Sequence, residues 1–382
     1  MSELSYLEKL LDGVEVEWVT LGSMADIGTG SSNRQDESEN GIYPFYVRSK
    51  NILKSDTFEF DEVAIVIPGE GGIGDIFHYV EGKYALHQRA YRIRITTNAV
   101  DTKFLYYFMS SSFKQYILTK SVGATAISIR KPMLEGFKVP IPSPDNPEKS
   151  LAIQSEIVRI LDKFTALTAE LTAELTAELN MRKKQYNYYR DQLLSFKEGE
   201  VEWKTLGEVA VIGTGNHDTQ DAIEHGKYIF YARGREPLKL NVFDFDETAI
   251  ITAGDGAGVG KVFHYAKGKY ALHQRAYRIV PNAFMNPRFV YHYITAYFFT
   301  YIQKASVSSS VTSLRRPMFL KFPIPVPPSE EQARIVEILD KFDTLTNSIT
   351  EGLPREIELR QKQYEYYRDL LFSFPKPETV SN

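Results

Sequence analysis

The chain contains the same unit twice. The segment VEWVTLGSMADIGTG at Val16–Gly30 returns as VEWKTLGEVAVIGTG at Val201–Gly215, and KYALHQRAYRI at Lys83–Ile93 returns unchanged at Lys269–Ile279. Further along, the motifs IVxILDKF and KQYxYYRDxLxSF also occur twice. A period of roughly 180 residues is far longer than the repeats of a solenoid, so it indicates two duplicated domains.

Each copy begins with short apolar or alternating runs separated by Gly, Pro and Asn, and one helical stretch follows them. Such runs predict strands, and the residues between them predict turns. Strands are expected over Glu62–Ile67, Tyr84–Ile93, Thr248–Thr252 and Tyr270–Val280, and helices over Lys103–Leu118 and Pro287–Lys304. The mixture predicts an α/β (α+β) fold class for two homologous globular domains.

A proline cluster closes each globular region, at Pro140–Ser150 and at Pro323–Glu331. Proline fixes φ and cannot continue a preceding element, so the two clusters predict stiff linkers that lead into the next helix. Ser329 is followed by two glutamates and is the expected N-cap of the second of these helices.

The helices after the linkers are expected to be long. A helix over Leu151–Leu194 measures about 65 Å, longer than a small domain, so it needs a partner along its length. The other copy supplies a helix of matched length, and the domain-then-helix order predicts antiparallel packing about a pseudo-twofold axis. TAEL occurs three times over Thr168–Leu179, and Gly352 and Pro354 predict a kink or short break opposite that segment.

The duplication divides the chain into five expected parts. These are a first globular domain at 1–149, a first long helix at 150–196, a second globular domain at 197–328, a second long helix at 329–374 and a tail at 375–382. The N-terminus is acidic with leucines at helical spacing, unlike a secretory signal, and the most apolar run, Val63–Pro68, has the length of one strand. We therefore expect a cytoplasmic protein without a membrane partner.

Motifs and composition argue against catalysis by this chain. The absence of cysteine excludes thiol catalysis, disulfides and thiolate metal sites. No P-loop, HExxH, GxSxG or (N/D)PP(Y/F) motif is present. GEGGIG at Gly69–Gly74 fits the dinucleotide fingerprint by letter, but strand, turn and strand are expected after it instead of a helix, so we interpret it as a turn. His87 and His273 could be general bases or metal ligands, although a structural role in a strand is the favoured interpretation.

The distribution of charge is more informative than its sum. The net charge of −4 gives no support to nucleic-acid binding by overall electrostatics. Residues 203–328, however, carry 15 basic and 9 acidic side chains. Basic residues also recur at equivalent positions of the two copies, as phosphate binding would require. The candidate DNA-binding residues are Arg34, Arg48, Lys50, Arg130 and Lys131 in the first copy, and Arg233, Arg235, Lys239, Arg315 and Arg316 in the second.

These features resemble the specificity (S) subunits of type I restriction–modification systems over nearly the whole chain. The resemblance depends on the doubled layout, the closing motif at Ile324–Asp343 with its weaker first copy, the tyrosine-rich helix ends and the TAEL repeats. It implies a non-catalytic subunit in which each globular domain reads one half of a split double-stranded DNA target. It also implies that the paired helices set the spacing and dock two methylation (M) subunits, joined by restriction (R) subunits. The chain itself is expected to need no cofactor, because S-adenosylmethionine, ATP and Mg²⁺ would bind the partner subunits.

A motif that is identical in both copies cannot distinguish two different half-sites, so bases are expected to be read where the copies differ. The differing segments are Ser31–Asn40 against Asn216–His225, Val47–Ser55 against Ala232–Leu240, and Val122–Arg130 against Val307–Arg315. Arginine reads guanine in the major groove, which makes the arginines of these segments the candidate base readers. Two alternatives stay open, a stand-alone DNA-modifying enzyme and a purely structural coiled-coil scaffold.

Overall fold

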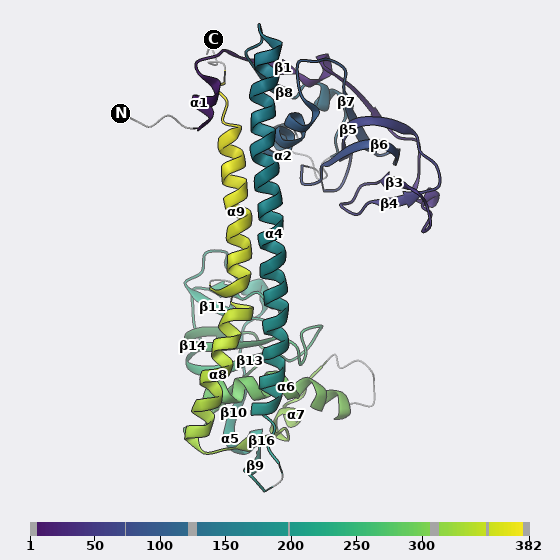
Figure 1. The fold of residues 1–382 in the computed structure, drawn as a ribbon. Coiled ribbons are helices and arrows are strands. Elements are labelled where there is room, and N and C mark those ends of the chain that lie inside the picture. The colour runs from purple at the N-terminus through teal and green to yellow at the C-terminus, as the bar shows by residue number, and fades with distance from the viewer. Residues whose placement is uncertain are drawn as a thin grey trace. The chain divides into compact units, whose positions relative to one another are not determined.

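The structure, a computed structural model, describes residues 6–72, 74–120, 128–197, 199–305, 313–348 and 351–376. The chain forms two compact units: unit 1 comprises Met1–Glu174 and Ile357–Asn382, and unit 2 comprises Leu175–Glu356. Each unit therefore combines one globular half with helical residues from both copies of the repeat. The two units contain equivalent strands and helices (Figure 1).

Unit 1 contains a six-stranded sheet in the order β2-β7-β5-β6-β3-β4. Neighbouring strands are antiparallel, except that β3 and β6 are parallel. The strands are β2 Ala25–Thr29, β3 Tyr43–Tyr46, β4 Leu53–Ser55, β5 Phe60–Pro68, β6 His78–Leu86 and β7 Ala90–Ile95. Helix α2 (Thr102–Lys120) shares the main core with β5, through buried side chains such as Phe104 and Ile65. The predicted strand at Glu62–Ile67 and the predicted helix at Lys103–Leu118 are confirmed.

Unit 2 repeats this arrangement with a sheet in the order β10-β15-β13-β14-β11-β12, in which β11 and β14 are the parallel pair. Its strands are β10 Ala210–Thr214, β11 Tyr228–Tyr231, β12 Leu238–Leu240, β13 Phe245–Ala253, β14 Phe263–Leu272 and β15 Ala276–Pro281. Helix α6 (Pro287–Ala305) packs against β13, β14 and β15, which confirms the helix expected at Pro287–Lys304. The strand expected at Thr248–Thr252 lies within β13.

The expected strands Tyr84–Ile93 and Tyr270–Val280 are wrong at their centres, where the chain turns. In the first, His87 accepts a hydrogen bond on Nδ1 from the backbone N–H of Arg89, 3.0 Å away. The same bond in the second measures 2.9 Å, from the N–H of Arg275 to His273 Nδ1. A side chain that bonds its own backbone two residues on competes with strand pairing, so each run becomes two strands joined by a turn.

The proline clusters begin as strands and not as linkers, which corrects the prediction. Strand β1 (Val16–Thr20) pairs with β8 (Lys138–Pro142), and β9 (Glu202–Thr205) pairs with β16 (Pro323–Val326), so that each cluster lies beside a tryptophan strand. Both are two-stranded sheets, in which every strand has a free edge. Alternate prolines are tolerated there because the missing N–H can face away from the partner strand.

The long helices are present. Helix α4 (Pro147–Leu193) begins inside the expected linker, and the second helical region consists of α8 (Ser329–Asn347) and α9 (Gly352–Leu371). The predicted break is confirmed at Gly352, whose φ of +78° favours glycine. The predicted N-cap is wrong, because Pro328 holds that position and makes no side-chain capping bond, which leaves Ser329 as the first helical residue.

The helices pack side by side within each unit. Figure 1 shows α9 running alongside α4. In unit 1 the rings of Phe164 on α4 and Tyr367 on α9 lie 5.7 Å apart, and Thr165 donates a 3.1 Å hydrogen bond to Tyr364. The chain directions are therefore opposite, as predicted. In unit 2 the equivalent rings, Tyr189 on α4 and Phe342 on α8, lie 5.6 Å apart.

The remaining short elements complete the two units. They are the helices α1 Tyr6–Leu11, α3 Lys131–Glu135, α5 Leu206–Val209 and α7 Arg316–Leu320, and the 3₁₀ turns η1 Leu21–Ser23, η2 Arg34–Asp36 and η3 Thr219–Asp221.

Candidate nucleic-acid interface

At one edge of each sheet, loops from distant parts of the unit are joined by backbone hydrogen bonds. In unit 1 the N–H to oxygen pairs are Gln88 to Ser32, His87 to Tyr46, Gly69 to Arg89 and Ile129 to Gly69, at 2.8–3.0 Å. In unit 2 they are Gln274 to His217, His273 to Tyr231, Gly254 to Arg275 and Leu314 to Gly254, at 2.7–3.0 Å. The HQR turn thus holds the loops that follow β2, β3 and β5, or their counterparts, in one place.

The second glycine of the repeated GTG motif makes this convergence possible. A Cβ on Gly30 would lie 1.9 Å from the backbone oxygen of Leu86, and one on Gly215 would lie 1.8 Å from that of Leu272. No side chain fits at either distance, so the loop after β2 or β10 can pass the end of the neighbouring strand only at a glycine. Packing therefore explains why the second glycine of GTG occurs in both copies.

In unit 1 this edge carries one carboxylate between two arginines. Glu70, in the glycine-rich turn after β5, accepts hydrogen bonds on Oε1 from Arg48 Nη1 and from Arg89 Nη1, the latter at 2.8 Å. The hydrogen bond from Arg89 is the main cause of the lowered pKa of Glu70, and the positive charge of Arg48 adds to it. The glycine-rich turn therefore serves as an anchor for arginines, consistent with its interpretation as a turn.

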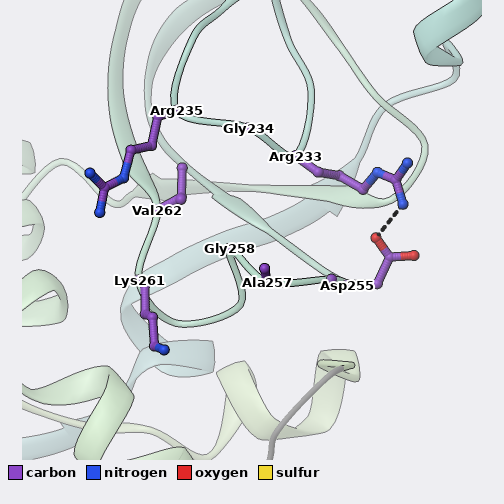
Figure 2. A pocket seen from close by; sticks show the side chains of 9 residues that line it. Arg233, Gly234, Arg235, Asp255, Ala257, Gly258, Lys261 and Val262 are labelled. Atoms are coloured by element: carbon purple, nitrogen blue, oxygen red, sulfur yellow. Dashed lines mark hydrogen bonds and ion pairs between the residues drawn. The ribbon is translucent and has the colours of Figure 1, made fainter. Parts of the chain in front are cut away.

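Unit 2 carries the same arrangement on Asp255. Arg233 Nη1 donates to Oδ1 at 2.9 Å, and Arg275 Nη1 donates to Oδ2 at 3.1 Å. Burial opposes the ionisation of Asp255, but the hydrogen bonds from the two arginines outweigh it, so its pKa is lowered. Figure 2 shows Arg233 turned toward Asp255 while Arg235 points to the opposite side of a hollow of about 460 Å³, with Lys261 on its rim.

Two strand histidines hold the loops that carry the first arginine of each pair. His78 Nε2 lies 3.3 Å from the backbone oxygen of Ser49, and His264 Nε2 lies 3.0 Å from that of Gly234. Burial lowers the pKa of both histidines, which favours the neutral ring. A neutral ring with its proton on Nε2 donates to the carbonyl and fixes the loop next to Arg48 or Arg233.

His87 and His273 are buried at the same edge, with 7% and 1% of their surface exposed. Burial is the first cause of their lowered pKa values. A neutral ring is required for Nδ1 to accept the N–H of the following arginine, so the geometry gives both residues a structural role in the HQR turn. Over the ranges that the structure describes, no group of three or more His, Asp or Glu side chains could hold a metal ion.

The loops after β2 and β10 differ between the units while keeping an acidic partner. Ser32 donates to Glu59 in unit 1, whereas His217 in unit 2 lies 3.1 Å from Asp244 through Nε2. Gln274 donates to Asp218 at 3.0 Å, while its counterpart in unit 1 donates to an asparagine. The shared turn therefore presents different polar groups beside equivalent arginine pairs.

The structure brings some of the predicted residues together and separates others. Arg34 and Arg48 line one hollow in unit 1, and Arg233 and Arg235 line the one in unit 2. Lys50 lies outside both hollows, on an exposed loop. Lys239 lies in strand β12, also exposed and outside them. Arg130 and Arg315 are the N-caps of α3 and α7, whose first residues are Lys131 and Arg316. All ten side chains remain predictions as DNA contacts.

Two of the segments expected to read bases lie largely outside the described residues. Of Val122–Arg130 and Val307–Arg315, the structure describes the ends from Ser128 and from Ser313 onward. Ser128 forms a backbone bridge with Glu70, and Ser313 forms one with Asp255. The ends of both segments therefore reach the arginine clusters.

Sequence reasoning missed the second arginine of each pair and its carboxylate as members of a candidate site. Arg89 and Arg275 lie in a motif that is identical in both copies and is therefore not expected to read bases, yet each shares a carboxylate with a loop arginine. The available signal was the conserved acid in GEG at 69–71 and GDG at 254–256. His78 and His264 also sit at equivalent positions, in FHY before the longest identical segment.

Comparison with known proteins gives the class of the chain. The sequence profile of the type I restriction modification DNA specificity domain matches residues 13–181 and again 198–359. The chain is 42% identical to the EcoR124I/EcoR124II specificity subunit of Escherichia coli over the full length of both proteins. It is 38% identical to the EcoprrI specificity subunit of the same species, over 92% of this chain and 93% of that one.

Solved structures agree with this fold. The S subunit of a type I restriction–modification system from M. genitalium aligns with a TM-score of 0.53 at 18% identity, covering 96% of this chain and 98% of that one. A chain from a study of complex assembly and conformational transition of the type I R-M system aligns with a TM-score of 0.60 at 14% identity, covering 94% and 98%.

The chain belongs to the family of type I restriction–modification DNA specificity proteins. Within that family it is a specificity subunit with two target recognition domains, and its role is recognition and not catalysis. The stand-alone enzyme and the structural scaffold are thereby disfavoured. No helix in the described parts of the chain combines the length and apolar character needed to cross a bilayer.

Proposed function

We propose that each recognition domain binds double-stranded DNA at the edge that carries its arginine pair, and reads one half of a bipartite target. One observation carries this proposal: the pairs Arg48/Arg89 and Arg233/Arg275 occupy equivalent places, while the loops around them differ in sequence. The common part suits either the phosphate backbone, which every target offers, or a guanine that both half-sites contain. The variable loops suit the bases that distinguish the two half-sites.

We further propose that the helices α4, α8 and α9 dock two methylation subunits, with restriction subunits joining for cleavage. The tyrosine-rich helix ends support two equivalent docking surfaces, because Tyr188 and Tyr366 are 62% and 61% exposed at matching positions of the repeat. S-adenosylmethionine, ATP and Mg²⁺ would then bind the partner subunits. The assembled complex would act on double-stranded DNA in the cytoplasm.

The test is to identify the sites that this subunit selects. The full chain is co-expressed with its methylation partner in a host that lacks other methylation systems, and modified bases are located by sequencing. The expected result is one bipartite motif with a fixed unread spacer. Methylation without a bipartite motif, or none that depends on this chain, would overturn the proposal.

A further inference from the structure

The arginine pairs are held in a way that folding stability does not explain. Arg48 and Arg89 are 46% and 59% exposed, and Arg233 and Arg275 are 41% and 64% exposed. Exposed ion pairs contribute little to stability and weaken with salt. The carboxylate is nevertheless present in both domains, beside loops that have diverged.

The position of each carboxylate is fixed by the backbone around it. Glu70 is bridged to Ser128, and Asp255 is bridged to Ser313, while the glycine before each acid bonds the backbone oxygen of the arginine in the HQR turn. The acid differs between the two domains. In the first domain both arginines bond Oε1 of Glu70, whereas in the second domain they bond separate oxygens of Asp255. A charge between two arginines is thus retained, whereas its side-chain length is not.

The carboxylate changes what the arginines can bind. A guanidinium has five N–H donors in a rigid fork, and each arginine here bonds the acid through Nη1. The acid also cancels one of the two positive charges. A DNA phosphate seeks the same donors and the same charge as the carboxylate, so it must compete with the acid. A base edge can instead bond the N–H donors that the acid leaves unused, so it does not have to compete with the acid.

We propose that Glu70 and Asp255 are specificity-determining residues of the two recognition domains. Each acid holds its arginine pair in one orientation and weakens sequence-independent binding of the arginines to phosphate. The domain therefore binds tightly only where the correct bases can accept hydrogen bonds from the oriented arginine N–H groups. This inference rests on the proposed function, because it assigns a role within the same DNA-binding edge.

The experiment compares two kinds of substitution in the full chain, assembled with its methylation partner. Glu70→Gln and Asp255→Asn remove the charge at nearly constant shape. Glu70→Asp and Asp255→Glu keep the charge, and each installs the acid that the other domain uses. Two measurements are made on every complex: sequencing of modified sites, and titration of a duplex lacking the wild-type motif at several salt concentrations.

Loss of the acid should strengthen binding to the non-target duplex and degrade one half of the motif. Each freed arginine that gains a phosphate contact steepens the slope of log affinity against log salt concentration by about 0.9. For one such contact, lowering the salt from 1 M to 0.1 M should raise the affinity by a further factor of roughly eight. Glu70→Gln should relax only the half-site read by the first domain, and Asp255→Asn only the other. The charge-keeping variants should retain the wild-type motif.

Internal and external controls separate this role from misfolding. The untouched half-site must stay fully defined in each single variant, which shows that the complex is intact. Glu81→Gln in β6 and Asp246→Asn in β13 remove exposed acids elsewhere in the same two sheets and should change neither measurement. An unchanged motif together with an unchanged salt slope in the charge-removing variants would overturn the inference. A wild-type complex without a bipartite motif would instead overturn the proposed function.

Discussion

Trp18 donates its indole N–H to the backbone oxygen of Pro375, 2.8 Å away, although 357 residues separate them in sequence. Both belong to unit 1, where the C-terminal end of the second copy closes over the first recognition domain. Phe372 and Phe374 complete this contact, with their rings 5.6 Å and 6.1 Å from that of Phe104. The core of the first domain therefore includes residues that follow helix α9 of the second copy.

Removing an aromatic ring from this contact should destabilise the first domain, although the ring is distant from that domain in sequence. Phe374 is 4% exposed, and replacing a buried phenylalanine by alanine costs about 3–5 kcal/mol. For Phe374→Ala we expect faster hydrogen exchange in α2 and β5, measured by mass spectrometry, with little change in β13. Tyr366→Ala removes a ring that is 61% exposed and serves as the control. Unchanged exchange in α2 would show that the C-terminal segment is not part of that core.

The aspartate of the repeated LDKF motif should stabilise the joint between each recognition domain and its helix. In unit 2 Asp340 accepts hydrogen bonds from Arg288 Nη2 at 2.6 Å and lies 2.7 Å from His292 Nε2. Because the aspartate is 37% exposed, we expect Asp340→Asn to cost about 1–2 kcal/mol, read from urea unfolding. Glu337→Gln breaks an exposed pair with Lys341 on the same helix and should leave the urea midpoint nearly unchanged.

Acid should destabilise the chain through the same aspartate at low pH. Burial opposes the ionisation of Asp340, but the hydrogen bonds from His292 and Arg288 outweigh it and lower its pKa. A carboxyl whose pKa is lower in the folded state stabilises the fold above its unfolded pKa, near 3.9, and loses that contribution as the pH falls further. The Asp340→Asn variant should therefore show a shallower loss of melting temperature between about pH 4 and 2 than the wild type.

Histidines should produce a second loss of stability at a higher pH. Burial lowers the pKa of His78, His87, His264 and His273, so the folded chain resists a proton that the unfolded chain accepts near pH 6.5. Stability should be constant above that pH and decline below it. We expect the melting temperature to fall between pH 7 and 5.5. The double variant His87→Asn with His273→Asn, which keeps an acceptor in each HQR turn, should fall less, and an equal decline would contradict the assignment.

The duplication was the most reliable guide to the fold. The offsets between identical segments predicted two equivalent α/β domains and two long helices. A helix or strand pattern that occurs at equivalent positions of both copies is more reliable than a pattern that occurs once. Local detail was less predictable where side chains compete with the backbone. At His87 the ring Nδ1 accepts the backbone N–H of Arg89, which turns the chain in the middle of an apolar run that was predicted to be one strand. Pro140 was predicted to lie in a linker, but it lies in a strand of a two-stranded sheet, where the unpaired edge tolerates proline.

The candidate site was only partly predictable, for a physical reason. Arg48 and Arg233 stood out because they lie in loops that differ between the copies. Their partners Arg89 and Arg275 lie in a motif that is identical in both copies, and such a motif cannot by itself distinguish two half-sites. Only the three-dimensional convergence of the loops shows that a shared arginine and a variable arginine bind one carboxylate.

Removing one TAEL repeat should change the spacing of the target and nothing else. Deletion of Thr176–Leu179 shortens α4 by about 6 Å, since each helical residue rises 1.5 Å. Duplex DNA advances about 3.4 Å per base pair, so the unread spacer should shorten by fewer than two base pairs. Sequencing of modified sites gives the spacer directly. Altered half-sites with an unchanged spacer would exclude the role of α4 in setting the distance.

Single arginine substitutions should assign the half-sites to the domains. Arg233 points toward Asp255 from a loop that differs between the copies, so Arg233→Ala should weaken discrimination at one position of the second half-site by about 1–3 kcal/mol. Arg48→Ala should do the same in the first half-site alone. The readout is the base frequency at each motif position, measured after co-expression with the methylation subunit.

A matched control distinguishes base reading from general electrostatics. Lys267→Ala removes one exposed positive charge from β14 of the same domain. A loss of charge alone weakens binding to every sequence and lowers the salt slope by about 0.9 at most, without changing the motif. If Arg233→Ala behaves like Lys267→Ala, the arginine binds phosphate and the bases are read elsewhere in the variable loops. If only Arg233→Ala changes the motif, and only in one half, the arginine cluster reads sequence.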